Sequence, residues 1–361
     1  MNLLSIIMAI FSIIGAIDLI LGNRFGIGEE FEKGLKMFGS LALSMIGMIV
    51  LAPCIANLLT PVLKSDVITA WVEPSVIMGS IFANDMGGAS LAKAFAVAED
   101  LGCYNGLVVG SMMGATISFT LPFALNEVKE EKHGSLFLGL MCGICTIPVG
   151  CFVAGLVAGF SLLKILWDLI PLVVFSIILI VGLLKFPKAS VRIFHVFGEF
   201  IRTLIIVGLV VGILEYLLQI KILPCAAPIM DGVDIVFNIV AVMTGAFPLI
   251  YLLSKLLKKP LKLAGKKVGI SETAALGFLS TLATSITTFG QMKDMDDKGV
   301  LLNSAFAVSA AFTFADHLAF TLSFNASYVW AVIIGKLLSG VLAVLMAWFL
   351  FCRKRRKYVE R

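Results

Sequence analysis

Residues 74–98 read PSVIMGSIFANDMGGASLAKAFAVA, an apolar run interrupted in its middle by the polar pair Asn84-Asp85 and by Gly87 and Gly88. Glycines at this position let the backbone turn and leave main-chain amides and carbonyls free for a ligand. Interrupted backbone at membrane depth is tolerated only where it is buried in protein or lines a watery cavity. We therefore predict that this run is a re-entrant hairpin or a broken helix.

The rest of the chain is also apolar. Hydrophobic residues make up 60% of the 361 residues and charged residues only 14%, and the mean hydropathy is +1.04. A soluble chain of this length needs more charge to cover its surface, so the composition indicates an integral membrane protein. Runs of about 20 apolar residues predict an all-α, polytopic transport domain covering residues 1–361. Its 9–11 membrane segments are centred in 2–22, 35–62, 74–98, 104–125, 134–159, 165–186, 194–217, 234–256, 271–292, 299–323 and 326–351.

Basic segments set the predicted orientation. The loops at 185–192 and 255–267 and the C-terminal tail at 353–357 are rich in Lys and Arg, so the positive-inside rule places all three in the cytoplasm. Three crossings after the second loop would leave the tail outside, so one run there is expected not to cross. The best candidate is the Ser- and Thr-rich run 271–292, SETAALGFLSTLATSITTFGQM. The alternative is an ordinary span beside a loop that violates the rule.

The two interrupted runs are predicted to enter the membrane from opposite faces and to belong to two repeats. Similar residues recur in both halves at nearly one offset: Met45, Gly47 and Gly79 with Met243, Gly245 and Gly277, and Gly106, Ser111, Phe119 and Thr120 with Gly299, Ser304, Phe312 and Thr313. We predict inverted repeats over about 35–125 and 234–323, with the solute site at their interface. An elevator-type movement follows by analogy with transporters of that architecture.

Ionisable residues inside apolar runs mark candidate functional positions, because a charge near the bilayer centre costs at least about 2.5 kcal/mol. Asp85 lies at the first interruption, with Lys93 as its expected charge partner, and a purely structural pair of these two is the alternative. Asp316 and His317 lie in FTFADHLAF, within the helix expected after the second interruption. For His317 a hydrogen-bonded core histidine is an equal alternative, and Lys336 either snorkels or pairs inside the protein.

Polar side chains near these charges complete the predicted substrate site. Thr313 precedes Asp316 by three residues and would share its helix face. Two carboxylates among hydroxyls and amides favour a small amine or amino alcohol, with or without a coupling ion. The candidate binding residues are Asn84, Asp85, Gly87, Gly88, Ser111, Thr120, Thr284, Ser285, Thr287, Gln291, Asn303, Thr313, Asp316 and His317.

Other functional classes are disfavoured. The sequence contains no H-E-x-x-H, no G-x-S-x-G and no paired histidines, so we expect no catalytic residue, metal or cofactor. The basic surface is too small to suggest binding of nucleic acid. The seven cysteines lie mostly inside apolar runs and are predicted to be small packing residues, including the C-x-x-C pair Cys142 and Cys145.

Four stretches resemble the ethanolamine permease family of the bacterial ethanolamine-utilisation system: FANDMGGASLAKAF, GLVVGSMMGATISFTLPFAL, the run Gly-Gln-Met-Lys-Asp-Met-Asp at 290–296, and SAFAVSAAFTFADHLAF. The resemblance implies a multi-pass protein of the bacterial inner membrane that takes up ethanolamine, which the cell then splits with a cobalamin-dependent lyase. By position, the residues that match the family pattern are Asp85, Gly87, Gly88, Asp316 and His317.

The sequence departs from the family pattern at two places. Thr284-Ser285-Ile286-Thr287 stands where Asn-Asn-x-Pro is expected in many members, and Asn84 stands where a cysteine is usual. The alternative function is therefore a sodium- or proton-coupled carrier for another small polar or cationic solute. In either case the expected partners are the solute, membrane lipid, H⁺ or Na⁺ as a candidate coupling ion, and further copies of the chain in a homo-oligomer.

Overall fold

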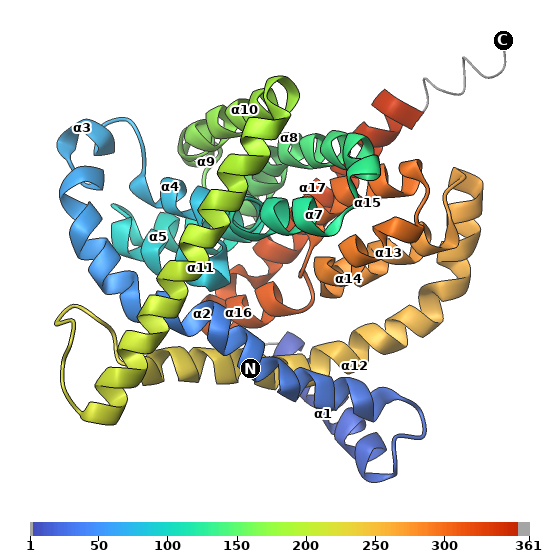
Figure 1. Ribbon diagram of the computed structural model, residues 1–361, viewed down its shortest axis with the longest axis horizontal. Coiled ribbons are helices and arrows are strands. Elements are labelled where there is room, and N and C mark those ends of the chain that lie inside the picture. Colours follow the sequence, from blue (N-terminus) through green and yellow to red (C-terminus); the bar gives the residue numbers. More distant parts are fainter. Residues whose placement is uncertain (1–2, 353–361) are drawn as a thin grey trace.

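The computed structural model describes residues 3–352, and over those residues its regular structure is entirely helical, as the sequence predicted. The long continuous helices are α1 (Leu3–Ile20), α2 (Ile27–Leu63), α8 (His133–Val157), α11 (Pro187–Leu218), α12 (Ile229–Val268) and α17 (Val329–Ala347) (Figure 1). A further long stretch contains π-helical turns and consists of α6 (Glu99–Tyr104), η2 (Asn105–Gly114), η3 (Thr116–Thr120) and α7 (Leu121–Glu127).

Fewer helices can cross a membrane than the sequence predicted. Among the described residues, seven stretches are long and apolar enough, or eight if α9 (Leu162–Asp168) and α10 (Ile170–Lys185), which are bent by 41°, form one span. The expected segments at 74–98, 271–292 and 299–323 are instead divided into short helices. These are α4 (Pro74–Ile81), α5 (Ala89–Phe95), α13 (Glu272–Ala283), α14 (Ser285–Gly290), α15 (Asp297–Ala310) and α16 (Asp316–Asn325). The hydropathy of a run depends on its side chains and not on whether its helix is continuous, so hydropathy alone predicted a membrane segment at each of these three runs.

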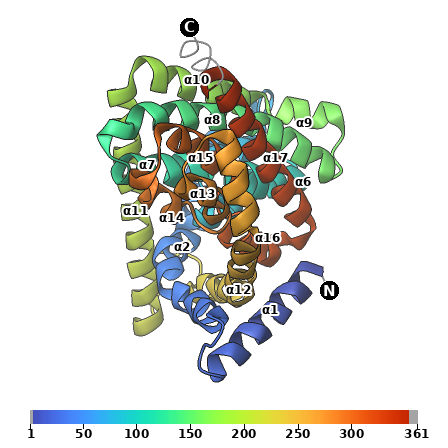
Figure 2. The same cartoon turned by 90° about the vertical axis from the view of Figure 1, so that its right-hand side faces the viewer.

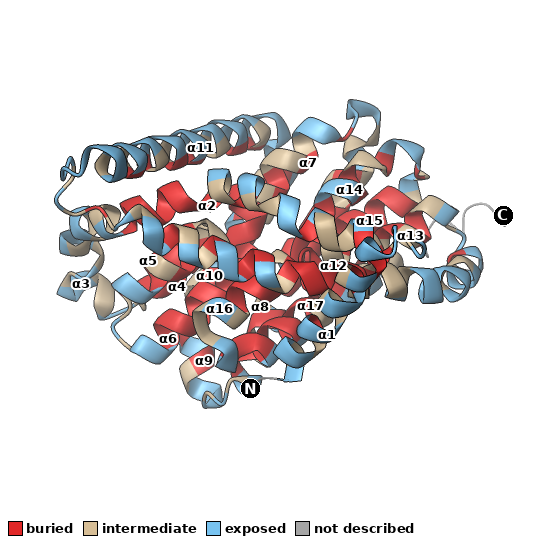
Figure 3. Ribbon diagram, turned by 90° about the horizontal axis from the view of Figure 1, so that it is seen from below, coloured by how far each residue is buried: buried red, intermediate tan, exposed pale blue. Residues whose placement is uncertain are grey.

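Helices α1 and α11 lie on the outside of the molecule and expose apolar side chains along most of their length (Figure 3). Only 17% of the most apolar part of α1 and 22% of that of α11 is buried, against 83% for the stretch Glu99–Glu127. Apolar faces of this size are unfavourable in water, whereas hydrocarbon is as apolar as the side chains themselves. The outer helices are therefore suited to contact lipid, as expected of a multi-pass membrane protein.

Two pairs of long helices pack closely together: α2 packs against α12 in the lower part of Figures 1 and 2, and α8 packs against α17. Each outer helix packs on the long helix of the other half of the chain: α1 packs on α12, and α11 packs on α2. Both crossings require glycine. A Cβ at Gly47 of α2 would lie 1.7 Å from the Ile205 carbonyl oxygen of α11, and a Cβ at Gly245 of α12 would lie 2.0 Å from the Met8 carbonyl oxygen of α1.

A disulfide between Cys54 and Cys225 joins α2 to the loop between α11 and α12. Beside it, the Ala227 amide donates a hydrogen bond of 3.0 Å to the Val50 carbonyl. The prediction that the cysteines serve only as packing residues is therefore wrong for these two. The two residues are 171 positions apart, so no local pattern could pair them. Three further cysteines whose side chains are described form no disulfide: Cys103, Cys145 and Cys151.

We expect Cys54→Ser to lower the melting temperature of the detergent-solubilised protein. A disulfide restricts the unfolded chain, and such bonds typically contribute about 2–4 kcal/mol to stability. A thermal-shift assay with and without reductant measures the effect. Cys145→Ser is the matched control, since this exposed cysteine forms no disulfide. Equal melting temperatures of wild type and Cys54→Ser without reductant would show that the crosslink does not form.

Candidate functional site

The first helix break lies between α4 and α5, in the turn η1 (Asn84–Gly88). Gly87 has a φ angle of 89°, in the left-handed region that favours glycine. A Cβ on this residue would also lie 2.1 Å from the Cγ atom of Met48 in α2. The turn therefore needs glycine for its backbone angle and for its close contact with α2, and it presents Asp85 at the break.

The span that follows stabilises this turn. The Ser118 hydroxyl accepts a hydrogen bond of 3.1 Å from the Ala83 amide and donates one of 2.7 Å to the Gly114 carbonyl. Within the turn, the Gly88 amide donates to the Ala83 carbonyl at 2.9 Å. Main-chain groups left over by the helix break are thus paired inside the protein, as the low-dielectric interior requires.

A second break, which the sequence did not predict, lies at 311–315 between α15 and α16 and beside the end of α13. Phe312 has a φ angle of 60°, which is uncommon for a residue other than glycine. Its amide donates to the Thr281 carbonyl at 3.1 Å, and the Phe314 amide donates to the Leu282 carbonyl at 3.0 Å. These bonds satisfy carbonyls in the last turn of α13. Asp316 is therefore the first residue of α16, not an interior residue of the continuous helix that the sequence predicted.

A cavity of about 270 Å³ lies between the two breaks. Asp85 and Asp316 both line it and are partly exposed to it, and their charges act on each other. The Ser40 and Ser44 hydroxyls of α2 and the Phe119 ring contribute to the wall. Two carboxylates beside hydroxyls and an aromatic ring are a suitable environment for a small organic cation.

The cation that the structure places beside this cavity is Lys336 of α17. Its side chain is buried, and Nζ lies 2.6 Å from the Ser111 carbonyl, to which it donates, and 3.0 Å from His317 Nδ1. The ammonium also interacts electrostatically with Asp85. Sequence reasoning left Lys336 out of the site, although a lysine inside an apolar run was a signal that could have included it.

The predicted pair between Asp85 and Lys93 is wrong. Lys93 lies in α5 with its side chain half exposed, and its Nζ is 3.3 Å from Glu99 Oε1. The sequence suggested Lys93 because it is the nearest lysine along the chain. Lys336 provides the positive charge instead, because α17 packs beside the span that contains Ser111.

The other predicted residues near the first break differ in their roles. Asn84 is fully buried, and both of its amide atoms lack a hydrogen-bond partner. Ser111 contributes its carbonyl, since its hydroxyl donates to a carbonyl of its own helix. Thr120 and Thr313 are buried. The Thr313 hydroxyl donates a hydrogen bond to the Ala310 carbonyl. Thr313 lies in the break between α15 and α16, so the prediction that it shares a helix face with Asp316 is wrong.

The second interrupted run borders a neighbouring cavity of about 330 Å³, which includes Asp316 in its wall. Thr284 and Thr287 line this cavity. Thr284 also caps α14, because its hydroxyl accepts a hydrogen bond of 3.3 Å from the Ile286 amide. Ser285 is buried and its hydroxyl has no hydrogen-bond partner. Thr284 and Thr287 therefore share a cavity with the carboxylate of Asp316, whereas Ser285 does not line it.

Two predicted residues lie elsewhere. Gln291 follows the end of α14 and lines neither the central cavity nor the neighbouring one. The Asn303 amide donates to the carbonyls of Ala274, at 2.9 Å, and Gly299, at 3.0 Å. Asn303 thereby fastens α15 to α13 and contributes to the fold rather than to the cavity.

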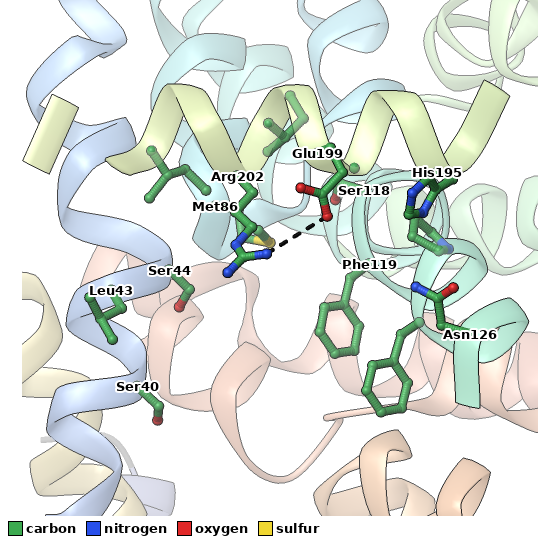
Figure 4. A pocket seen from close by; sticks show the side chains of 15 residues that line it. Ser40, Leu43, Ser44, Met86, Ser118, Phe119, Asn126, His195, Glu199 and Arg202 are labelled. Carbon is green, nitrogen blue, oxygen red and sulfur yellow. Dashed lines mark ion pairs between the residues drawn. The ribbon is translucent and has the colours of Figure 1, made fainter. Parts of the chain in front are cut away.

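A third cavity, of about 360 Å³, extends the central one toward α11 (Figure 4). The two cavities share Ser40, Ser44 and Phe119. On α11, Arg202 and Glu199 line the extension, with 3.8 Å between their charged groups. The central cavity therefore continues in two directions, toward the first turns of α2 and toward the first half of α11.

The family model of the ethanolamine utilisation protein EutH matches residues 1–350. The chain is 42% identical over 351 residues to the probable ethanolamine permease EutH of Listeria monocytogenes, covering 97% of this chain and 94% of the relative. It is 36% identical over 382 residues to the protein of the same name from Escherichia coli, covering 95% and 94%.

A third relative, the uncharacterized protein YxeR of Bacillus subtilis, is 37% identical over 341 residues, covering 94% of this chain and 92% of the relative. No solved structure matched the chain. Since the relatives from Listeria monocytogenes and Escherichia coli are named probable permeases, the family is one of transporters rather than enzymes, as the sequence predicted. With a family match over nearly its whole length, the chain belongs to the EutH family of ethanolamine utilisation proteins.

Proposed function

We propose that this protein carries ethanolamine, in its protonated form, across the bacterial inner membrane. The supporting observation is the charge around the central cavity. Counted by formal charge, Asp85 and Asp316 contribute two negative charges and Lys336 one positive charge, with His317 taken as neutral because its Nδ1 faces the lysine ammonium. The set then carries one net negative charge, which a single ammonium ion neutralises.

The remaining chemistry of the cavity suits an amino alcohol. An ammonium group can donate charge-assisted hydrogen bonds to the two carboxylates, and the Ser40 and Ser44 hydroxyls, which donate to carbonyls of their own helix, can accept one from a substrate hydroxyl. The Phe119 ring can contact the short carbon chain. The names of the relatives from Listeria monocytogenes and Escherichia coli, both probable ethanolamine permeases, support this choice among small cations.

The two short helix pairs are proposed to be re-entrant hairpins. Helix α4 packs against α5, and α13 packs against α14. The 8 residues of α4 extend only about 12 Å, less than half of the roughly 30 Å hydrocarbon core. A hairpin that returns to the face it entered accounts for this length, and it keeps the polar turns buried in protein.

We further propose that the two halves are inverted repeats. Gly47 and Gly245, which match in sequence, contact α11 and α1 respectively, and these two helices are exchanged between the halves. Gly79 and Gly277, the next matching pair, each lie in the first helix of a short pair, where that helix packs against a later one, η2 in the first half and α15 in the second. A Cβ at Gly79 would lie 2.2 Å from the main-chain oxygen of Asn105, and a Cβ at Gly277 would lie 2.4 Å from the side-chain Oδ1 of Asn303.

The predicted basic loops are helical in the structure, since 187–192 begins α11 and 255–267 lies near the end of α12. With these basic helix ends on the cytoplasmic side, the first hairpin enters from outside and the second from inside. The basic tail at 353–357, also predicted to be cytoplasmic, lies outside the described residues. Both extensions of the central cavity then lead toward the cytoplasm, since α2 and α11 begin on that face. Elevator movement of the hairpins against α1, α2, α11 and α12 would expose the same carboxylates to the outside.

Uptake of radiolabelled ethanolamine into proteoliposomes tests this function. We expect Asp316→Asn to reduce initial uptake about tenfold, which corresponds to the loss of about 1.4 kcal/mol of binding free energy. Asp234→Asn, which removes an exposed carboxylate on α12, is the matched control and should keep wild-type uptake. Unlabelled ethanolamine should compete with the label, whereas ethylene glycol, which lacks the amine, should not.

Two results would count against the proposal, and they can be told apart. Wild-type protein that takes up no ethanolamine would contradict the function itself. Normal uptake by Asp316→Asn would leave the function standing and would contradict only the role of this carboxylate.

A further inference from the structure

A buried polar cluster lies away from the substrate cavity, where α4, η2 and α9 meet. The Asn105 amide nitrogen donates two hydrogen bonds, to Asp168 Oδ1 at 3.0 Å and to Ser75 Oγ at 2.9 Å. The Ser75 hydroxyl in turn donates to Glu73 Oε1 at 3.1 Å. None of these residues lines any of the three cavities described above, so the cluster is a separate feature of the fold.

Two oxygen atoms in this cluster lack a partner. Asp168 Oδ2 and Asn105 Oδ1 are both buried without a hydrogen bond, and the two residues are 5% and 0% exposed. An unpaired buried acceptor typically costs about 1–3 kcal/mol, and more if it is charged. Because the two side chains are hydrogen-bonded to each other, both free oxygens belong to one small region. Acceptors can be satisfied only by a donor or by a cation.

The surrounding charges favour a cation. The charged groups that act on Asp168 are Glu73, Asp100 and Lys164. Lys164 is already engaged, since its Nζ lies 2.6 Å from Asp100 Oδ2. Three carboxylates thus face one ammonium, and that ammonium is partly exposed and paired. The cluster therefore keeps a net negative charge next to its two free oxygens.

The backbone at this position is also broken. Helix α9 ends at Asp168, and the chain bends by 41° before α10 continues. Pro171, in the first turn of α10, has no amide hydrogen and so cannot complete the helical hydrogen bond across the bend. In membrane transporters, discontinuous helices of this kind supply oxygen ligands to coupling ions.

We propose that Asp168 and Asn105 form a binding site for Na⁺, separate from the substrate cavity. Carboxylate and amide oxygens are the ligands that hard cations prefer. One buried carboxylate with a neutral amide matches a single positive charge. Among the described residues no cluster of three or more acidic, His or Cys side chains suitable for a more highly charged metal was found. The partly exposed Asp100 and Lys164 mark the side from which an ion would enter.

Sodium binding to the purified full-length protein in detergent tests the site without any transport measurement. We expect radioactive ²²Na⁺ to bind saturably, and sodium chloride to raise the melting temperature above that in choline chloride. Asp168→Asn should weaken sodium binding at least tenfold, because it removes the charge and keeps the shape. Asp234→Asn, which removes an exposed carboxylate of α12 outside the cluster, is the matched control and should bind sodium as wild type does.

Asn105→Ala provides a second variant in case Asp168→Asn does not fold. It removes the free amide oxygen and should also weaken sodium binding. Wild-type protein that binds no sodium would overturn the proposal and would leave Asp168 as a protonated residue of the fold. Sodium binding by Asp168→Asn with wild-type affinity would overturn it as well. Neither outcome bears on ethanolamine transport, so the two proposals can fail separately.

Discussion

Replacing Lys336 with methionine is expected to reduce ethanolamine uptake by at least about 100-fold. Methionine has a similar length but no charge, so Asp85 and Asp316 would face each other beside the cavity without a counter-charge. The Ser111 carbonyl would also lose the donor that lies 2.6 Å away. Removing one partner of a buried charge pair costs about 3–5 kcal/mol, and a 100-fold change corresponds to about 2.7 kcal/mol.

Initial uptake rates in proteoliposomes, corrected for the amount of inserted protein, measure this effect. Lys221→Met is the matched control, since this half-exposed lysine lies in the loop after α11, away from the cavity, and pairs with Glu215 of α11. Wild-type uptake by Lys336→Met would contradict the charge balance that supports the proposed substrate.

A double variant separates a loss of charge balance from a failure to fold. Asp85→Asn combined with Lys336→Met leaves Asp316 as the one charged residue of the three, so the net charge of the set returns to minus one. We expect this protein to melt at a higher temperature than the single lysine variant, and to regain part of the uptake. A double variant that is less stable than Lys336→Met would show that the two charges do not compensate each other.

The charged residues of the site could be found from the sequence, but most of their partners could not. Asp85, Asp316 and His317 stood out because ionisable groups are costly inside apolar runs. Lys336 carried the same signal, yet its partner Ser111 is 225 residues away in the chain. Choosing Lys93 as the partner of Asp85 relied on nearness in sequence, which says little about packing between helices.

The breaks in the helices show the same limit. The first was predicted because Gly87 and Gly88 mark a turn directly in the sequence. The second, at 311–315, reads Ala-Phe-Thr-Phe-Ala and contains neither glycine nor proline. It is broken because the amides of Phe312 and Phe314 bond carbonyls of α13, which is a tertiary contact. The sequence therefore predicted the breaks within 74–98 and 271–292, where α4 and α5 and α13 and α14 are separate helices, but not the break at 311–315.

Gly87→Val is expected to abolish measurable uptake, since the substitution disturbs the turn in two independent ways. The φ angle of 89° is strained for any residue with a β-carbon. A Cβ would also lie 2.1 Å from Met48 Cγ, and Met48 is fully buried and cannot move aside freely. Moving the turn away from α2 would displace Asp85 from the cavity. Uptake rates, together with the melting temperature, measure the effect.

Two comparisons separate these causes. Gly39→Val, on the same helix as Met48, is the matched control, because nothing lies within 4 Å of a Cβ there and its backbone angle is not strained. Gly87→Ala combined with Met48→Ala removes the clash but keeps the backbone strain. We expect it to transport better than Gly87→Ala alone and still less well than wild type. If the double variant gained nothing over Gly87→Ala, backbone strain alone would be responsible, and contact with α2 would not position Asp85.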